Sequence, residues 1–382
     1  MIKKKVDIVK KSLSAHKKLK GKISVINKVN IKNSSDLSVY YTPGVGAVSD
    51  YLAKNKNQTK EYTIKSNSVA VISDGSAVLG LGNLGPEGSI PVMEGKCQLF
   101  KSFGGIDAWP IVLNTQDVDE IVKTVKNIAP VFGGINLEDI SAPRCFEIEE
   151  RLSRELDIPV IHDDQLGTSM VILAGLINAL KVANKKIVDT KVVIVGAGAA
   201  GIATAKLLSQ KKFKDLILVD SKGIISKTRK DLNSEKTKIL EVTNKQNLSG
   251  SLDEATIGAD IIIGLSKAGA FKKFHIKNMN EKPIVFAMAN PVPEIDPGEA
   301  ISAGAFIVAT GRSDFPNQIN NVLGFPGIFR GALDNKVKKI TLPMILKASE
   351  NLASIVKKPS KNCIIPSVFD KNVIKAVSKA II

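Results

Sequence analysis

Two kinds of feature in this 382-residue chain could carry chemistry, paired acidic residues and a glycine-rich turn. Glu138 and Asp139 form one acidic pair, and Asp163 and Asp164 form the other. Oxygen ligands without nearby histidine or cysteine favour Mg²⁺ or Mn²⁺ over zinc. The pairs therefore predict a divalent-cation site, while surface acids or helix N-caps account for such pairs about as often.

The first acidic pair ends a predicted strand at 135–139, and the second comes directly after a predicted strand at 158–161. In open α/β sheets ligands gather at the carboxyl ends of strands, so the two pairs could converge on one site. Neighbouring residues on a regular strand point to opposite faces. Glu138 and Asp139 can therefore share an ion only if the strand has ended and the backbone turns there.

The glycine-rich turn matches the pattern G-x-G-x-x-G in its expected context. An apolar strand at 191–195 precedes it, and a helix at 199–208 follows it. The first glycine allows a tight turn, the second lets the backbone approach a pyrophosphate, and the third lets helix and strand pack closely. The predicted dinucleotide contacts are Gly196, Ala197, Gly198, Ala199, Ala200 and Gly201.

Asp220 ends the next predicted strand and is the expected ribose contact. Its carboxylate would accept a hydrogen bond from a ribose 2′-hydroxyl and repel a 2′-phosphate, which favours NAD. Ser221 and Lys222 beside it weaken that preference, so NADP stays an alternative. The alternative for the whole motif is a glycine turn in a sheet that binds no nucleotide.

Histidine offers little for proton transfer. The chain has only His16, His162 and His275, and none has a partner at catalytic or metal-ligand spacing. His162 precedes Asp163 and could orient it, although a structural role fits at least as well. A histidine base is therefore disfavoured, and lysine or tyrosine must be considered instead.

Positive charge is concentrated at the two ends of the chain. The formal net charge is +17, yet residues 1–32 hold eleven lysines and one acid, and residues 334–382 hold ten lysines and three acids. The body between them is neutral, with 33 basic and 33 acidic residues. A nucleic-acid enzyme more often carries positive charge through its body, so we expect solvated basic ends and no nucleic-acid partner.

The cysteines and the N-terminal sequence bear on localisation. Cys97, Cys145 and Cys363 are odd in number and far apart, which fits reduced thiols and neither a disulfide framework nor a zinc site. The start of the chain lacks the apolar region of a signal peptide, and no uninterrupted apolar run approaches the length of a membrane span. These observations predict a soluble cytoplasmic protein that does not bind membranes.

The pattern of predicted elements indicates the α/β class. From about residue 68 onward, short β-branched runs alternate with longer helical patterns, which is typical of helices layered around parallel sheets. We expect an N-terminal catalytic domain at 1–163, a doubly wound parallel-sheet Rossmann domain that binds NAD(P) at 164–321, and a segment at 322–382 that packs back on the first domain.

Taken together, the motifs resemble the malic enzymes, specifically their short bacterial form. The matching segments occur in the family's order at 41–46, 73–86, 91–96, 136–139, 162–168, 196–201, 289–291, 317–321 and 325–327. The resemblance implies a malic-type N-terminal domain. It also implies that the protein oxidises and decarboxylates (S)-malate to pyruvate and CO₂ with NAD(P)⁺ and a divalent cation, Mg²⁺ or Mn²⁺.

The resemblance assigns roles position by position. Glu138, Asp139 and Asp164 correspond to the metal ligands. Lys96 corresponds to the base that takes the proton of the malate C2 hydroxyl, and Tyr41 to the acid that protonates C3 of enolpyruvate. An unperturbed lysine has a pKa of about 10.4, so Lys96 needs burial or nearby positive charge to be neutral at pH 7.

Further assignments from the resemblance concern supporting groups. Asp163 corresponds to a residue that supports the metal ligands, and Asn290 and Asn321 correspond to contacts with cofactor and substrate. Larger eukaryotic members have an arginine that grips a substrate carboxylate where this chain has Ala77. How the C4 carboxylate of malate is held therefore stays open.

The resemblance also has implications for assembly. It implies a homodimer or larger homo-oligomer, with the partner's N-terminal segment as a candidate to complete the active site. Some bacterial relatives carry a phosphotransacetylase-like domain after the malic part, and this chain is too short to hold one.

Two other functions stay open from the sequence. One is an enzyme of the same scaffold with a different outcome, such as malolactic conversion or oxidation of another 2-hydroxy acid. The more remote one is a non-catalytic protein that senses nucleotides or binds nucleic acid through its basic ends.

Overall fold

Two separate β-sheets organise the computed structural model, which describes residues 2–382 and the side chains from residue 8 onward. The strand order is β2-β1-β3-β4 in the first sheet and β10-β9-β8-β5-β6-β7 in the second. The first sheet contains β1 (Ser68–Ser73), β2 (Asp107–Val112), β3 (Gly134–Leu137) and β4 (Val160–His162). The second contains β5 (Lys191–Val195), β6 (Asp215–Asp220), β7 (Gly223–Ile224), β8 (Ile261–Gly264), β9 (Ile284–Ala287) and β10 (Ile307–Thr310).

The strands pair in parallel, except for the short antiparallel pair of β6 and β7. Parallel sheets covered by helices on both faces need strands that are apolar on both faces. β1 is buried along its whole length, and β8 is a buried run of three isoleucines and a glycine. The predicted α/β class with a Rossmann-type sheet is therefore confirmed.

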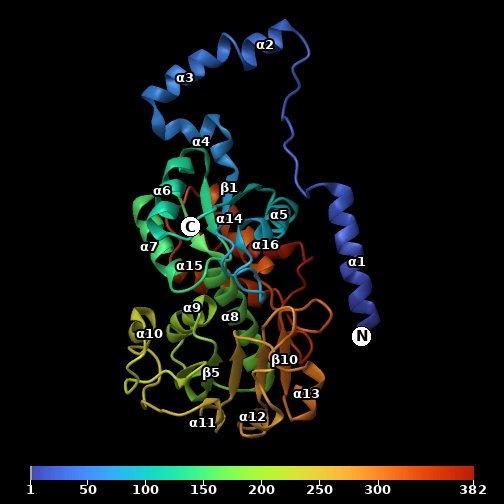
Figure 1. The fold of residues 1–382 in the computed structure, drawn as a ribbon, viewed down its shortest axis with the longest axis vertical. Helices are drawn as coiled ribbons and strands as arrows, with labels where there is room; N and C mark the ends of the chain where they lie inside the picture. The colour runs from blue at the N-terminus through green and yellow to red at the C-terminus, as the bar shows by residue number, and fades with distance from the viewer. Residues whose placement is uncertain (1) are drawn as a thin grey trace.

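Helices surround both sheets (Figure 1). Helices α1 to α4 precede the first strand, and α14 to α16 follow the last one. The helices are α1 (Ile2–Leu19), α2 (Ser34–Tyr40), α3 (Gly44–Lys54), α4 (Thr59–Tyr62), α5 (Gly85–Gly104), α6 (Val118–Ile128), α7 (Arg144–Glu155), α8 (Asp163–Ala183), α9 (Ala199–Ser209), α10 (Ser234–Ile239), α11 (Leu252–Thr256), α12 (Lys273–Lys277), α13 (Pro297–Ser302), α14 (Phe325–Asp334), α15 (Leu342–Ser354) and α16 (Asn372–Ser378).

Helix α8 joins the two sheets and lies in the core. It packs against α9 of the second sheet and against α15 of the C-terminal segment. It begins at Asp163, and its first turn holds the second acidic pair, where the helix dipole favours negative charge. Among the described residues it alone is long and apolar enough to cross a bilayer, but 72% of that stretch is buried inside the fold. It is therefore a core helix.

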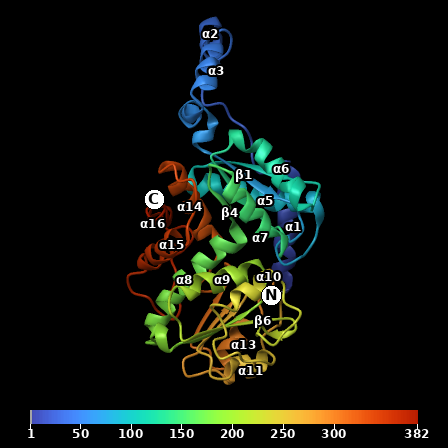
Figure 2. The ribbon, with the colours of Figure 1, turned by 90° about the vertical axis from the view of Figure 1, so that its left-hand side faces the viewer.

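The C-terminal helices pack back against the N-terminal sheet region (Figure 2). The ring of Phe100 in α5 meets the rings of Phe325 and Phe329 in α14, with centroids 4.7 and 5.4 Å apart. Edge-on aromatic pairs of this kind contribute about 0.5–1.5 kcal/mol beyond the area they bury. This packing supports the predicted return of residues 322–382 to the first domain. The boundaries 1–163, 164–321 and 322–382 themselves stay a proposal.

Residues 8–54, here called the N-terminal arm, are mostly exposed. Helices α2 and α3 have no buried residue and stand beyond the end of the first sheet in both views (Figures 1 and 2). Lys22 ties the arm to α5, since its backbone N–H donates to Glu94 at 3.3 Å and its Nζ donates to the carbonyl of Pro91 at 2.6 Å. The exposed large apolar side chains of the arm include Ile23, Val25, Ile26, Val29, Ile31, Leu37, Val39, Tyr40, Tyr41, Val45, Val48 and Tyr51.

Candidate active site

The two acidic pairs meet at the carboxyl end of the four-stranded sheet. β3 and β4 are neighbours, with Leu137 in register with His162, so the residues that follow them emerge side by side. One oxygen each of Glu138, Asp139 and Asp164 lie within 4.8 Å of one another. The sequence predicted this convergence only if the backbone turned after the strand.

The required turn is present at Asp139. β3 ends at Leu137, and Asp139 has a φ of 53°, in the left-handed region that non-glycine residues seldom occupy. This conformation lets Glu138 and Asp139 face the same site although they are consecutive. The backbone N–H of Asp139 donates to Asp164 Oδ2 at 3.0 Å, which ties the two pairs together.

Lys96 lies between the acidic pairs. It projects from α5, its side chain is only 7% exposed, and its Nζ lies 2.6 Å from Asp163 Oδ2 and 2.8 Å from Glu138 Oε1. The same Nζ lies 4.2 Å from the ring centroid of Phe325. Burial alone would lower the pKa of Lys96, but the carboxylates of Asp163 and Glu138 outweigh burial and raise it. In this arrangement Lys96 is an ammonium.

The acidic cluster consists of Glu138, Asp139, Asp163 and Asp164. These are more carboxylates than Lys96 alone can neutralise. Burial, followed by the charges of Asp164 and Glu138, raises the pKa of Asp139 to about 9. Burial also raises the pKa of Asp163 to about 7. Oδ2 of Asp139 is buried without a hydrogen-bond partner. An orphaned carboxylate oxygen among like charges fits a hard divalent cation with oxygen ligands.

Asp163 is held by groups from two other elements. Its Oδ2 accepts from Lys96 and, at 2.6 Å, from the side-chain amide of Asn321, which opens the short helix η5 (Asn321–Leu323). A Cβ at Gly167 would lie 1.8 Å from Asp163 Oδ1, so a glycine is needed one turn further along α8. Asn136 supports the other pair, since its Nδ2 donates to Glu138 Oε2 at 2.9 Å. Asp163 thus contacts both Lys96 and Asn321, and its supporting role stays a prediction.

The glycine turn has the geometry expected of a dinucleotide site. Gly196 has a φ of +112°, and a Cβ there would lie 2.1 Å from the carbonyl oxygen of Leu265. A Cβ at Gly201 would lie 1.7 Å from the carbonyl oxygen of Gly196. Only a glycine at position 201 therefore lets α9 pack this closely against the turn after β5. Gly198 caps the N-terminus of α9 and has open space where its Cβ would be, which suits a bound pyrophosphate. Ala197, Ala199 and Ala200 complete the turn.

Asn290, in the loop after β9, contacts the loop that follows β1 of the other sheet. A Cβ at Gly80, in the glycine-rich segment after β1, would lie 1.9 Å from the carbonyl oxygen of Asn290. The backbone N–H of Ala77 in the same segment donates to the carbonyl of Asp139 at 2.9 Å. This segment therefore connects the acidic cluster to the Rossmann side, where Asn290 is predicted to contact the cofactor.

Asp220 is the last residue of β6, as predicted, but its carboxylate is already paired with two cationic side chains. Its carboxylate pairs with Arg229 through two contacts of 2.7 and 3.1 Å, and with Lys236 Nζ at 2.6 Å. Neither cation was predicted from the sequence. They follow the strand within a polar loop and the short helix α10, where nothing in the local pattern indicates the direction of their side chains.

Two buried glutamates were also not predicted from the sequence. Glu294 accepts from the backbone N–H groups of Ser266 and Ala289, both at 2.9 Å, and so joins the loops after β8 and β9. Glu149 accepts from the backbone N–H of His162 at 2.8 Å and from Gln165, and burial raises its pKa to about 7. Both glutamates position backbone next to the proposed site.

His162 is buried, and its ring nitrogens have no hydrogen-bond partner. Burial lowers its pKa to about 4, so the ring is neutral at pH 7. Its Nε2 lies 3.8 Å from Asp164 Oδ2, too far for a hydrogen bond. These observations agree with a structural histidine beside the acidic cluster.

Tyr41 is the predicted catalytic residue that the structure does not bring to the cluster. It caps the C-terminus of α2 on the N-terminal arm, and it is 62% exposed. The helices on either side of it, α2 and α3, stand away from both sheets (Figure 1). Within one chain, Tyr41 and Lys96 are therefore apart.

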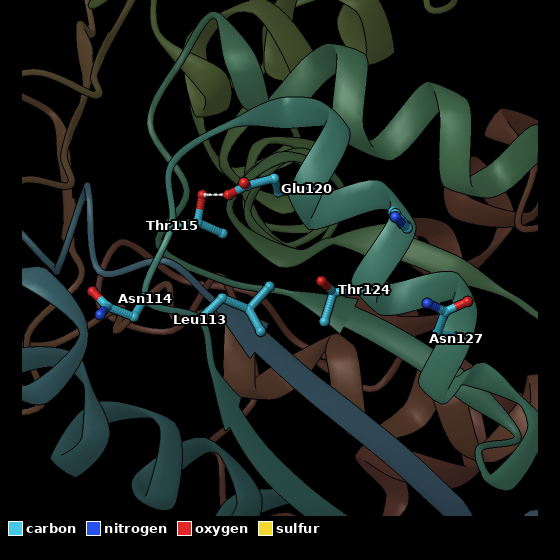
Figure 3. Close-up of a pocket in the computed structure, with 7 residues that line it drawn as sticks. Leu113, Asn114, Thr115, Glu120, Thr124 and Asn127 are labelled. Atoms are coloured by element: carbon cyan, nitrogen blue, oxygen red, sulfur yellow. Dashed lines mark hydrogen bonds between the residues drawn. The ribbon is translucent and has the colours of Figure 1, made fainter.

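A shallow hollow of about 430 Å³ lies elsewhere, between the end of β2 and α6 (Figure 3). It is lined by Leu113, Asn114, Thr115, Glu120, Lys123, Thr124 and Asn127. None of the predicted site residues lines it, so it is separate from the acidic cluster.

Both halves of the chain match known protein families. Residues 20–153 match the family described as "Malic enzyme, N-terminal domain", and residues 166–382 match "Malic enzyme, NAD binding domain". The chain is 52% identical to the bifunctional malic/malolactic enzyme of Bacillus subtilis, over 97% of this chain and 91% of that protein. It is 53% identical to the NAD-dependent malic enzyme of Geobacillus stearothermophilus, over 95% of this chain and 76% of that protein.

A solved structure gives the same result. The crystal structure of the NAD-dependent malic enzyme of Thermotoga maritima superimposes with a TM-score of 0.93 at 50% identity. The match covers 97% of this chain and 98% of that one.

Proposed function

The chain belongs to the malic enzyme family, and from this premise we propose that it oxidises and decarboxylates (S)-malate to pyruvate and CO₂ while reducing a nicotinamide cofactor. The observation that carries the proposal is the buried network in which Lys96 bridges Asp163 and Glu138 beside two further carboxylates. The same chain holds a glycine turn suited to the cofactor that accepts the hydride.

We place a divalent cation, Mg²⁺ or Mn²⁺, on Glu138, Asp139 and Asp164. The orphaned oxygen of Asp139 and the excess of negative charge support this placement. A bound divalent cation supplies Lewis-acid stabilisation of charge on substrate oxygens, an effect of several kcal/mol. Asp139 Oδ2 is then no longer a buried acceptor without a partner.

Lys96 is the proposed base for the malate C2 hydroxyl. Lys96 is an ammonium between two carboxylates in the structure, so it must give up a proton before it can act as a base. Glu138 would hold the cation, and Asp163 would then be the carboxylate that takes this proton and leaves Lys96 as a neutral amine. Asp163 lies 2.6 Å away and is positioned to exchange the proton with Lys96. Asn321, which donates to the same oxygen, keeps the Asp163 carboxylate in place.

Tyr41 is the proposed acid at C3 of enolpyruvate, and we propose that it reaches the cluster of a second copy of this chain. Its exposure and its place on the N-terminal arm support this arrangement. The arm also carries many apolar side chains that are uncovered in one chain, and a contiguous exposed apolar surface is typical of an interaction site. The protein is then a homodimer or a larger homo-oligomer whose active sites are shared between subunits.

An enzyme assay tests the reaction, the cofactor and the metal together. Purified full-length protein is incubated with malate, NAD⁺ or NADP⁺, and Mg²⁺ or Mn²⁺, each with an EDTA control, and the reduced nicotinamide is followed by absorbance. We expect metal-dependent reduction that EDTA abolishes, with pyruvate as the product. A protein that forms no reduced nicotinamide in any combination contradicts the proposal.

Malolactic conversion is the second candidate, because the Bacillus subtilis relative is named for both reactions. Product analysis after incubation with malate, Mn²⁺ and NAD⁺ distinguishes them. Lactate without net NADH would establish the second outcome in place of the first.

We also propose that the protein is soluble and cytoplasmic. The core position of α8 and the absence of a cysteine pair from the described side chains support this placement.

A further inference from the structure

Glu294 is a buried carboxylate that the proposed reaction does not use. Its side chain is fully buried, and its two oxygens accept hydrogen bonds from two different loops. Oε1 accepts from the backbone N–H of Ser266, and Oε2 accepts from that of Ala289, both at 2.9 Å. Ser266 follows β8 and Ala289 follows β9, so one side chain joins the carboxyl ends of two neighbouring strands.

The fold leaves space for this carboxylate. A Cβ at Gly264, the last residue of β8, would lie 2.4 Å from Cδ of Glu294. Burial raises the pKa of Glu294, and the hydrogen bonds from Ser266 and Ala289 oppose that shift. A buried acceptor without a partner is costly, so the carboxylate holds the two loops at a fixed spacing.

The two loops lie on the nicotinamide side of the second sheet. A doubly wound sheet binds the two halves of a dinucleotide on either side of the point where the strand order reverses. In this sheet the order reverses between β5 and β8. Asp220, the predicted ribose contact, ends β6 on one side of that point. The loops after β8 and β9, on the other side, therefore face the nicotinamide half.

Glu294 lies beneath the surface that these loops present. Ser266, Lys267 and Asn290 are exposed, whereas the carboxylate that holds the loops is not. Ligands of open α/β sheets bind outside the carboxyl ends of the strands, where these exposed residues lie. Glu294 therefore acts through the loops, as a positioning residue, and does not itself touch a ligand.

The loop after β9 also abuts the segment that contacts the acidic cluster. A Cβ at Gly80 would lie 1.9 Å from the carbonyl oxygen of Asn290. Leu79, the neighbour of Gly80, donates its backbone N–H to Asp139 Oδ1 at 3.3 Å. The loop that Glu294 holds is thus packed between the cofactor side and the proposed metal side.

We propose that Glu294 positions the nicotinamide half of the cofactor, because it holds the loops after β8 and β9 at the spacing that this half requires. The adenosine half, on the β6 side, does not depend on Glu294. The inference rests on the proposed function in its use of a nicotinamide dinucleotide. It adds a residue that lies outside both the glycine turn and the acidic cluster.

Binding without malate tests the inference on the full-length protein. The Kd of NADH is measured from the fluorescence of the reduced nicotinamide, and the Kd of ADP-ribose, which lacks the nicotinamide, from competition with NADH. Glu294→Gln keeps the shape of the side chain, but its amide nitrogen cannot accept from the second loop. We expect the Kd of NADH to rise by about tenfold and the Kd of ADP-ribose to change by less than about twofold.

Glu299→Gln is the matched control. Glu299 follows in α13, and its side chain is exposed. The substitution removes the same charge from the same part of the chain without touching either loop. It should leave both dissociation constants within about twofold of their starting values.

Hydrogen exchange of the unsubstituted protein gives a second test, which does not require the variant to fold. We expect saturating NADH to slow exchange in peptides that cover residues 265–271 and 288–293. ADP-ribose should leave exchange in both peptides unchanged, because it lacks the group that the loops face.

Either of two results overturns the inference. One is a Glu294→Gln protein in which the constants of NADH and ADP-ribose rise equally or both match the control, as a glutamate with only a structural role would give. The other is an unsubstituted protein in which NADH and ADP-ribose protect the two peptides equally, or in which neither protects them.

The two proposals can fail separately. A protein that shows the expected difference between NADH and ADP-ribose but forms no pyruvate from malate contradicts the proposed function and leaves the inference standing. A protein that forms pyruvate with NAD⁺ but shows no such difference contradicts the inference alone.

Discussion

The acidic cluster and the N-terminal arm hold the two proposed proton-transfer residues in opposite surroundings. Lys96 is 7% exposed and fixed by two carboxylates and an aromatic ring, whereas Tyr41 is 62% exposed at the end of an uncovered helix. A buried charge keeps one position because leaving its partners is costly. An exposed side chain on an apolar arm takes its position from whatever covers the arm. One chain therefore contains a preorganised half of the site, and we propose that a second copy supplies the other half.

The largest effect is expected for Lys96→Ala. Loss of the general base should lower malate turnover by about a thousandfold, while binding of NADH, which occurs at the other sheet, stays close to its starting value. Steady-state assays and nicotinamide fluorescence measure the two quantities. Lys101→Ala, a substitution of an exposed lysine in the same helix, is the control and should keep most of the activity. Turnover of Lys96→Ala within a few-fold of the control would remove Lys96 from the mechanism.

Mixing two inactive chains tests whether the halves come from different copies. Tyr41→Phe and Lys96→Ala proteins are each expected to be nearly inactive. Unfolded together and refolded, or co-expressed, they should regain about a quarter of full activity, because half of randomly paired twofold dimers are mixed and each mixed dimer has one intact site. If Tyr41 acts within its own chain, the mixture stays inactive, and the proposed sharing of sites is wrong.

The third prediction concerns metal binding at the acidic cluster, where negative charge is in excess. A saturating excess of Mn²⁺, about 100 times Kd, should stabilise the unsubstituted protein by about 2.7 kcal/mol. Asp139→Asn should lose most of this gain, and without metal it should be no less stable than the unsubstituted protein, because burial and the neighbouring carboxylates already disfavour the charged form of Asp139. Thermal unfolding with Mn²⁺ or EDTA measures both. An undiminished Mn²⁺ response in Asp139→Asn would show that the ion binds elsewhere.

The smallest effect is expected for Ile26→Ala, which is compared with a substitution in the core. Ile72→Ala removes a fully buried side chain of β1 and should cost about 2–5 kcal/mol of unfolding free energy. Ile26→Ala acts on an arm side chain that is 79% exposed, so it should change that free energy by less than about 0.5 kcal/mol. Urea denaturation gives both values, and sedimentation shows whether Ile26→Ala instead weakens the dimer. Similar costs at both positions would mean that the arm is packed like the core.

Local features of the site were predictable from the sequence. β3, β4 and the glycine turn were expected within two residues of their observed places, because their signals lie within a few consecutive residues. The acidic pairs were expected to converge, and their oxygens do lie within 4.8 Å of one another. Family membership is likewise confirmed, since the motifs that carried the resemblance span most of the chain.

Other features could not be predicted from local patterns. Lys236 reaches Asp220 from 16 residues further along the chain, and Asn321 reaches Asp163 from 158 residues further. No periodicity in the sequence records where such long side chains end. The sequence placed the second acidic pair after a strand, but it did not indicate that this pair forms the first turn of α8.

The sequence by itself determined the α/β class, the dinucleotide turn, the acidic pairs and the family, because each depends on residue types at short spacing. The tertiary structure alone decided that Lys96 is an ammonium between two carboxylates and that Asp220 is paired with Arg229 and Lys236. It also decided that Tyr41 is exposed on an arm that stands away from both sheets. The physical reason is that the charge state and reach of a side chain depend on which distant groups the fold brings within a few ångströms of it.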